Sequence, residues 1–336
     1  MIWPFLLAAA AQTTPCDLIR STALQQEARQ ALSKRQPRLA VERFQQASAA
    51  CPGERVNLLG LAEAQTAARD FAAAIETAQR YLDGNASSVR GRVVLAGAYL
   101  MAGRPKEALA EADRILKSHP FEAAALKIKG NSAYLLGDAS QAIGVFILLL
   151  DRHPADPDGA YMLGRIYYQE GQIDLAIGQF ERALKTNPSS SYKSLDNLGL
   201  CYAAQGDDEK ATGYFLAAIK LVEKDYPEYE WPYTNLADLL LKKGDPQRAF
   251  DAASMAAKRN PLSARSFYTG AKALDQLDKT DLALNWTQRA ASIDPDYSDA
   301  WYLMARLHHK LGQEAKANEA RLRFLAAKAK EPAKRR

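Results

Sequence analysis

Histidines are the first residues to consider for chemistry, because imidazole serves both as a general base and as a metal ligand. The chain has four of them. His119 and His153 each precede a proline and lie 34 residues apart, so a repeated structural role accounts for both. His308 and His309 are adjacent, and adjacent residues on a helix point about 100° apart, which does not suit a shared metal. The histidines therefore indicate neither a catalytic base nor a metal site.

Other catalytic patterns are missing from the sequence as well. It contains no G-x-S-x-G, H-E-x-x-H, C-x-x-C or G-x-x-x-x-G-K-[ST] motif. Acidic pairs such as Asp207 and Asp208 stand where a turn is expected, and aspartate commonly caps helices there. We therefore expect a protein that is not an enzyme, with no catalytic residue, no metal, no cofactor and no small-molecule substrate.

Prolines recur at a fixed interval and reveal the elements that carry the remaining polar residues. Pro120, Pro154 and Pro188 are 34 residues apart, and so are Pro261 and Pro295. Proline lacks an N–H and disfavours helix in the residue before it, so each one is expected to end a helix. A period of this length is typical of stacked helix pairs.

The residues inside each interval also repeat in phase. In residues 157–190, small residues stand at Gly164 and Ala176, a turn glycine at Gly171 and an aromatic at Phe180. The following interval repeats this order with Gly199, Gly206, Ala211 and Phe215. Small residues let two helices approach closely, and glycine suits the left-handed turn that ends a helix. Each interval is therefore predicted to form two amphipathic helices joined by a turn.

In these small residues, aromatics and turn glycines, and in its 34-residue period, the chain resembles the tetratricopeptide repeat family. The resemblance implies an all-α, right-handed α-solenoid of about nine stacked antiparallel helix pairs over residues 15–327. The pairs are expected to start near residues 21, 55, 89, 123, 157, 192, 230, 264 and 298. The sixth interval is longer before Pro227, which predicts an extended second helix there.

The resemblance also implies where a partner would bind. In arrays of this family the concave groove is lined by the first helix of each pair. At the groove positions this sequence places aromatic, amide and charged side chains, namely Lys127, Asn131, Tyr134, Tyr161, Arg165, Tyr168, Asn197, Trp231, Asn235, Asp238, Tyr268, Lys272, Tyr302 and Arg306. Aromatic rings supply apolar area, and Asn, Lys and Arg can satisfy a peptide backbone or carboxylate. We expect a protein or peptide partner in this groove; alternatively, several of the tyrosines only fill gaps between repeats.

Two of the three cysteines form a candidate disulfide. Cys16 precedes the first predicted pair and Cys51 closes its second helix, and the ends of antiparallel helices can meet. Such a bond would form only in an oxidising compartment, and two free thiols are the alternative. Cys201 lies inside a predicted first helix, where we expect a small buried apolar residue.

Residues 1–14 resemble a signal peptide and leader. Ile2 to Ala11 is apolar, and three alanines before Gln12 resemble a small-residue cleavage site. A basic stretch, which a signal peptide usually has at its start, is missing. Alternatively, this segment is an apolar N-terminus that packs on the first helix. We therefore expect a periplasmic or cell-envelope protein, exported in a bacterium, with a cytoplasmic location as the alternative.

Composition favours a helical scaffold over a nucleic-acid binder. The chain holds 62 alanines, and alanine is the best helix former. The net charge is +5, of which residues 328–336 contribute +4. This basic tail could contact a membrane surface, whereas the nearly neutral remainder gives no argument for nucleic acid.

The function that these observations predict is a non-catalytic protein- or peptide-binding scaffold that uses the concave groove. One alternative is a non-catalytic subunit of an envelope enzyme or of a secretion or assembly complex, with contacts on its edges or convex face. Another is a membrane or nucleic-acid adaptor that works through the basic tail.

Overall fold

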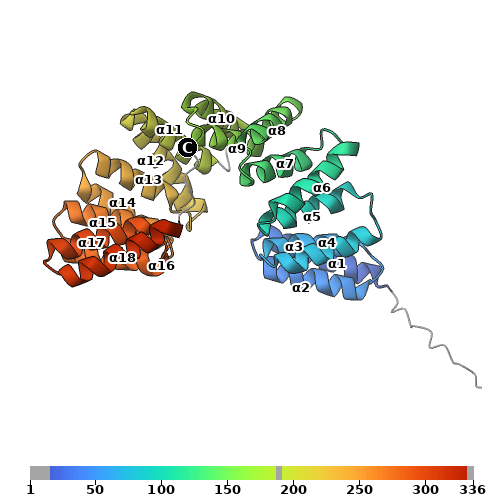
Figure 1. Ribbon diagram of the computed structural model, residues 1–336. Helices are drawn as coiled ribbons and strands as arrows, with labels where there is room; N and C mark the ends of the chain where they lie inside the picture. Colours follow the sequence, from blue (N-terminus) through green and yellow to red (C-terminus); the bar gives the residue numbers. More distant parts are fainter. Residues whose placement is uncertain (1–15, 187–190, 331–336) are drawn as a thin grey trace, which may run out of the picture. The chain divides into compact units, whose positions relative to one another are not determined.

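A computed structural model describes residues 16–186 and 191–330 of the chain, and these residues form eighteen helices and no strand (Figure 1). The chain divides into two compact units, unit 1 up to Met162 and unit 2 from Leu163, and the division falls inside helix α9. The proposed signal peptide, residues 1–14, lies outside the described residues.

Unit 1 is a stack of antiparallel helix pairs. Its helices are α1 (Leu18–Ser33), α2 (Pro37–Ala50), α3 (Val56–Ala67), α4 (Phe71–Asp83), α5 (Val89–Met101), α6 (Pro105–Ser118), α7 (Ala123–Leu135), α8 (Ala139–Arg152) and the start of α9 (Pro157–Gln169). From α1 to α8, each helix packs against the next one along the chain. In every pair we call the odd-numbered helix the first and the even-numbered helix the second.

Unit 2 continues the same order of helices. After α9 come α10 (Ile173–Thr186), α11 (Ser191–Gln205), α12 (Asp208–Asp225), α13 (Trp231–Lys242), α14 (Pro246–Arg259), α15 (Ala264–Gln276), α16 (Thr280–Ile293), α17 (Ser298–Lys310) and α18 (Glu314–Lys330). The predicted all-α solenoid of nine antiparallel pairs is thereby confirmed over the described residues. The expected extension of the sixth pair is present in α12, which has 18 residues.

The helix starts can be compared with the expected ones. Helices α5, α7, α9, α15 and α17 begin at residues 89, 123, 157, 264 and 298, the positions expected from the repeat. Helix α1 begins at Leu18, three residues before the expected start at 21. Helix α18 continues to Lys330, so residues 328–330, expected in the basic tail, are helical. The remainder of that tail, residues 331–336, lies outside the described residues.

The turn inside each pair uses a left-handed residue. Glycine takes this conformation in six pairs, for example Gly171 with φ 73°. At the equivalent position the first, second and eighth pairs carry Arg35, Arg69 and Asp278, with φ of 57°, 65° and 56°. Because a side chain is strained in this region, the repeated geometry must hold these three residues there.

Close contact between the two helices of a pair depends on a small residue opposite a large one. A Cβ added to Gly164 would lie 2.9 Å from the ring of Phe180, and one added to Gly199 would lie 2.5 Å from the ring of Phe215. Phe180 and Phe215 are fully buried. The recurring glycine and phenylalanine of the sequence are therefore the two sides of one packing contact.

Neighbouring pairs of unit 2 meet chiefly where the second helix of one pair packs on the first helix of the next, and their first helices also contact one another. Helix α11 contacts α13, α13 contacts α15 and α15 contacts α17. Within the described part of unit 2, no such contact joins α12, α14, α16 and α18 to one another. The first helices are therefore the more closely spaced layer, as expected for the concave side of a solenoid unit.

A disulfide closes the first pair. Cys16 and Cys51 are bonded, with their Cα atoms 4.2 Å apart. Cys16 lies two residues before α1, and Cys51 directly follows α2, so the bond forms where antiparallel helices bring their ends together. Cys201 is buried in α11, as expected for an apolar role, and burial raises the pKa of its thiol to about 12.

Candidate functional site

The candidate site is built on the first helices of unit 2 and centres on one carboxylate. Asp238 of α13 accepts hydrogen bonds from three groups of α15: Arg265 Nη2 at 3.0 Å, Thr269 Oγ1 at 3.2 Å and Lys272 Nζ at 2.9 Å. Arg265, Thr269 and Lys272 share one face of α15 because they are spaced by three and four residues. One acidic group thus fixes two cations at the surface.

The same network extends to α11 through an amide. Asn235 of α13 donates through Nδ2 to Asp196 Oδ1 at 2.9 Å and accepts at Oδ1 from Arg265 Nη2 at 3.1 Å. Asp196 is only 3% exposed. Burial raises the pKa of its carboxyl to about 7, although the hydrogen bond from Asn235 and the charge of Arg265 oppose the shift. Asp196 is therefore the group in this network that titrates nearest neutral pH.

Aromatic rings support both cations of the network. The Arg265 guanidinium lies 5.5 Å from the ring centre of Trp231, and Lys272 Nζ lies 5.0 Å from that of Tyr268. Tyr268 in turn contacts Tyr297 edge to face at 5.2 Å. Burial, with smaller contributions from nearby carboxylates, raises the pKa of Tyr268 to about 12 and also raises that of Tyr297. Both tyrosines therefore stay neutral and offer apolar surface to a partner.

Part of this network remains accessible. Trp231 is 40% exposed and Tyr302, on the next first helix, is 52% exposed. Asp238, Arg265 and Lys272 are half-buried. We call this set the first-helix site, comprising Asp196, Trp231, Asn235, Asp238, Arg265, Tyr268, Thr269, Lys272 and Tyr302. It presents aromatic surface and hydrogen-bonding groups side by side, which suits the binding of an extended chain.

Arg306 lies at the edge of this site. Its Nη2 atom pairs with Asp275 at 3.5 Å, and Lys310 pairs with Asp275 at 3.4 Å and with Asp278 at 2.9 Å. The ring of Tyr302 contacts Phe324 of α18 at 5.6 Å. Asp275 of the preceding helix pair thus holds Arg306, in the same way that Asp238 of its own preceding pair holds Lys272.

Other residues predicted for the groove lie on unit 1. Lys127 is paired with Asp156 at 3.2 Å and with Asp158 at 3.1 Å. Partial burial lowers the pKa of the Lys127 ammonium group. The hydrogen bonds from Lys127 to the two aspartates outweigh this effect, so the pKa is raised above its ordinary value. Asn131, Tyr134 and Tyr161 are half-buried on α7 and α9. In unit 1, therefore, the one predicted cation is committed to carboxylates of its own unit.

Three further predicted residues lie on the early first helices of unit 2. Arg165 and Tyr168 are half-buried on α9, and burial raises the pKa of the Tyr168 hydroxyl. The charge of Arg265 opposes this shift. Asn197 of α11 donates to the carbonyl of Lys193 on its own helix at 2.8 Å.

Sequence reasoning missed Arg265 and Thr269. Both lie on a first helix at positions that line the groove in the other pairs, so the same positional rule could have found them. Asp196 also occupies a groove position of its helix, so the same rule indicates it. Its burial and its hydrogen bond with Asn235 are what the sequence does not show.

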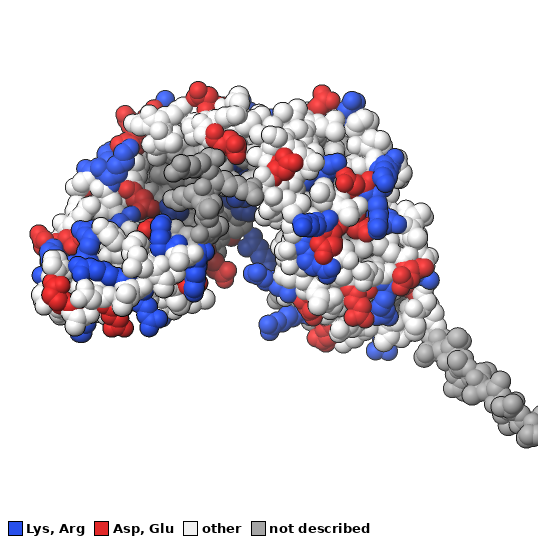
Figure 2. Space-filling model, in the orientation of Figure 1, with Lys and Arg blue, Asp and Glu red and all other residues white. Residues whose placement is uncertain are grey.

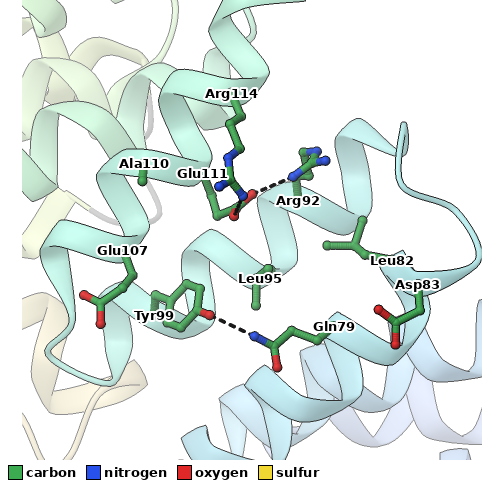
Figure 3. A pocket seen from close by; sticks show the side chains of 10 residues that line it. All are labelled: Gln79, Leu82, Asp83, Arg92, Leu95, Tyr99, Glu107, Ala110, Glu111 and Arg114. Atoms are coloured by element: carbon green, nitrogen blue, oxygen red, sulfur yellow. Dashed lines mark hydrogen bonds and ion pairs between the residues drawn. The ribbon is translucent and has the colours of Figure 1, made fainter.

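A pocket lies in unit 1, among α4, α5 and α6 (Figure 3). It has a volume of about 430 Å³. Leu95 and Tyr99 of α5 line it, between helices α4 and α6. Glu111 pairs with Arg92 at 2.8 Å and also with Arg114, while Tyr99 accepts a hydrogen bond from Gln79 at 3.0 Å. The charges that line this pocket largely neutralise one another, so its chemistry indicates no particular ligand.

The described residues hold no sign of a metal or membrane-spanning function. In residues 16–186 and 191–330, no three His, Cys, Asp or Glu side chains are grouped so as to hold a metal ion. None of the helices in these ranges is long and apolar enough to cross a membrane. On the face that Figure 2 shows, basic and acidic side chains are interspersed rather than gathered by sign.

Comparison with known families identifies the repeat. A family model described as tetratricopeptide repeat matches residues 93–160, 161–227 and 234–298, and a second model of the same description matches residues 286–318. A curated relative, the protein CTR9 homolog of Arabidopsis thaliana, is 26% identical over 125 residues. That match covers 37% of this chain and only 12% of the relative.

Solved structures show the same fold. A chain in the crystal structure of the APC/C hetero-tetramer Cut9–Hcn1 is similar with a TM-score of 0.61 at 15% identity, over 88% of this chain and 61% of that one. A tetratricopeptide repeat protein from Parabacteroides merdae ATCC 43184 has a TM-score of 0.52 at 17% identity, over 86% of this chain and 98% of that one. At these identities the likeness concerns the fold.

Proposed function

Because the chain belongs to the tetratricopeptide repeat family, we propose that it is a non-catalytic scaffold that binds an extended protein or peptide segment at the first-helix site of unit 2. One observation carries this proposal. Asp238 holds Arg265 and Lys272 at the surface, and exposed or half-buried aromatic rings lie directly beside both cations. Stability alone does not require this arrangement, because partly exposed ion pairs contribute little to it.

The side chains of the site favour a peptide that carries both apolar and hydrogen-bonding groups. Arg265 uses Nη2 for both of its hydrogen bonds, so other N–H groups of the guanidinium are available to carbonyl or carboxylate oxygens of a partner. Trp231 and Tyr302 supply apolar area at either side. An extended segment that lies across α13, α15 and α17 would therefore meet apolar and polar groups in alternation.

We further propose that the protein works in an oxidising compartment, which supports the bacterial periplasm or cell envelope over the cytoplasm. The support is the Cys16–Cys51 bond, because disulfides persist in exported proteins and are rare in the cytosol. Mass spectrometry of the native protein, with thiols blocked at lysis, should find both cysteines paired. Recovery of the two free thiols would argue for the cytoplasm.

The binding proposal is tested with peptides selected from a random displayed library on the folded full-length chain. The affinity of a selected peptide is measured by fluorescence anisotropy for the native protein and for a variant with Trp231→Ala, Lys272→Ala and Tyr302→Ala. We expect the variant to bind at least about tenfold more weakly, because it loses two apolar anchors and one cation.

The matched control changes exposed side chains on second helices of the same unit, with Leu175→Ala, Leu216→Ala and Met255→Ala. It should keep the native affinity, and circular dichroism should show unchanged helicity for both variants. The proposal is overturned if selection yields no binding peptide, or if the control weakens binding as much as the first-helix variant does.

A further inference from the structure

Helix α18 carries a second apolar face that residues 16–186 and 191–330 leave uncovered. Its inner face packs through Ala317, Ala320 and Ala327, which are buried. On the opposite side Leu322 and Leu325 are 68% and 60% exposed. Single exposed leucines are common on protein surfaces, but these two are neighbours, because residues three apart share one side of a helix.

The helix around these leucines is basic on balance. With about 100° between successive residues, the exposed alanines Ala315, Ala326 and Ala329 extend the leucines into an apolar stripe. The same geometry places charges of both signs on each flank of the stripe, namely Glu319 with Lys316, Arg323 and Lys330 on one side, and Glu314 with Arg321 and Lys328 on the other. Lys330 also pairs with Asp296 at 2.6 Å. Five cations and two glutamates give this helix a net charge of +3.

The repeat shows that Leu325 lies where other pairs are covered. Ala291, which is 34 residues earlier, is 4% exposed and lies in a core cluster with residues of α17. A further pair, or a second copy of the chain, could in principle cover Leu325 in the same way. The net charge of +3 on this helix argues against a second copy, because two such faces would repel each other.

We propose that α18 docks on an anionic phospholipid surface, with Leu322 and Leu325 entering the interface and the flanking cations contacting the headgroups. An apolar stripe between basic side chains is the pattern of helices that lie in the plane of a membrane surface. Long basic side chains can keep their charge among the headgroups while their stems cover apolar area. Two leucines bury little area, so binding requires anionic lipid and is reversible.

The test uses the full-length protein and vesicles made of equal parts of phosphatidylcholine and phosphatidylglycerol, with vesicles of phosphatidylcholine alone for comparison. Co-sedimentation should occur with the anionic vesicles only and should weaken at high salt. The pair Leu322→Ser and Leu325→Ser should lower the partition coefficient at least about tenfold. The pair Arg321→Gln and Arg323→Gln should lower it by a similar factor.

Two controls match these variants. Leu282→Ser removes an exposed leucine of α16 that has Asp281 beside it, and Lys242→Gln with Lys243→Gln removes two exposed charges at the end of α13. Both should bind vesicles as the native chain does. A chain truncated after Lys330 should also still bind, because the stripe and its flanks are intact.

Several results would overturn the proposal. One is the absence of sedimentation with anionic vesicles. Another is a loss of binding with the arginine pair but not with the leucine pair, which would indicate attraction by charge alone. Binding to a DNA duplex in place of vesicles would assign the cations to nucleic acid. A dimer in light scattering that the leucine pair abolishes, without vesicle binding, would make a second copy the occupant.

Discussion

At the scale of single residues, Asp196 shows how position determines chemistry. Its carboxyl is buried on α11, its recorded hydrogen bond is the one from Asn235, and Arg265 is directed to Asn235 and Asp238 instead. A buried carboxylate without a paired cation is costly in its charged form. Asp196 therefore favours the protonated form up to a pH near 7.

This raised pKa predicts a pH-dependent effect of Asp196→Asn. Below about pH 4 the native carboxyl is protonated in both the folded and the unfolded chain, so the substitution has little effect. As the pH rises toward 7, the unfolded chain releases its proton first and native stability falls. At about pH 8 the variant should be more stable by roughly 1–4 kcal/mol.

Urea unfolding of both proteins across this pH range measures the difference. The asparagine keeps an oxygen that can accept from Asn235, so it reproduces the neutral form of the native residue. A difference in the free energy of unfolding that stays constant from about pH 4 to about pH 8 would contradict the assignment.

The residues of the first-helix site were predictable individually but not as a network. Asp238 and Lys272 occupy the same place in successive repeats, 34 residues apart, so stacking brings them together. The sequence alone did not indicate that Arg265 would bond to Asp238 and Asn235 rather than to Asp196. That choice depends on side-chain geometry between helices, which a repeat pattern does not specify.

At the scale of helices, the 34-residue period predicted the pairs well because the same contacts recur in each one. A small residue on the first helix and a ring on the second define the contact, and Gly164 with Phe180 is one example. The turns were less predictable. Arg35, Arg69 and Asp278 adopt a conformation that their side chains disfavour, so the neighbouring helices determine the turn there.

The glycine contact predicts the effect of Gly164→Ala. The added methyl group would lie 2.9 Å from the ring of Phe180, so the two helices must separate slightly, at a cost of about 1–3 kcal/mol in the free energy of unfolding. In a background with Phe180→Leu the same substitution should cost clearly less. Urea unfolding of the double-mutant cycle measures this coupling, and two independent, additive effects would refute the contact.

The disulfide predicts a local effect at the first pair. Helix α1 buries mainly small or polar side chains, namely Ser21, Gln25, Ala28 and Ala31, so its packing supplies little apolar burial. The Cys16–Cys51 bond closes a loop with a sequence separation of 35, which stabilises the folded pair by roughly 3–4 kcal/mol. Cys16→Ala with Cys51→Ala should therefore destabilise α1 and α2 first.

Hydrogen exchange followed by mass spectrometry locates this effect. Peptides from α1 and α2 should lose protection in the double variant, while peptides from α7 and α8 serve as the internal control and should change little. Equal loss of protection in all four helices, or no loss in α1, would show that the bond does not support the first pair.

At the scale of the whole molecule, the family explains both the composition and the absence of an evident catalytic pattern. Many of the alanines lie at close helix contacts, for example Ala176, Ala211 and Ala249, which are fully buried. Apolar burial is divided among successive pairs rather than gathered in one core, as in other repeat proteins.

The central claim is that a partner binds on the first helices of unit 2, and site-specific photocrosslinking in the native host tests it most directly. A photoreactive phenylalanine analogue is placed at Trp231 or Tyr302 on first helices, and at Leu216 or Met255 on second helices. We predict that the same partner is crosslinked from Trp231 and Tyr302 and not from Leu216 or Met255. Crosslinks that form only from the second helices would contradict the account.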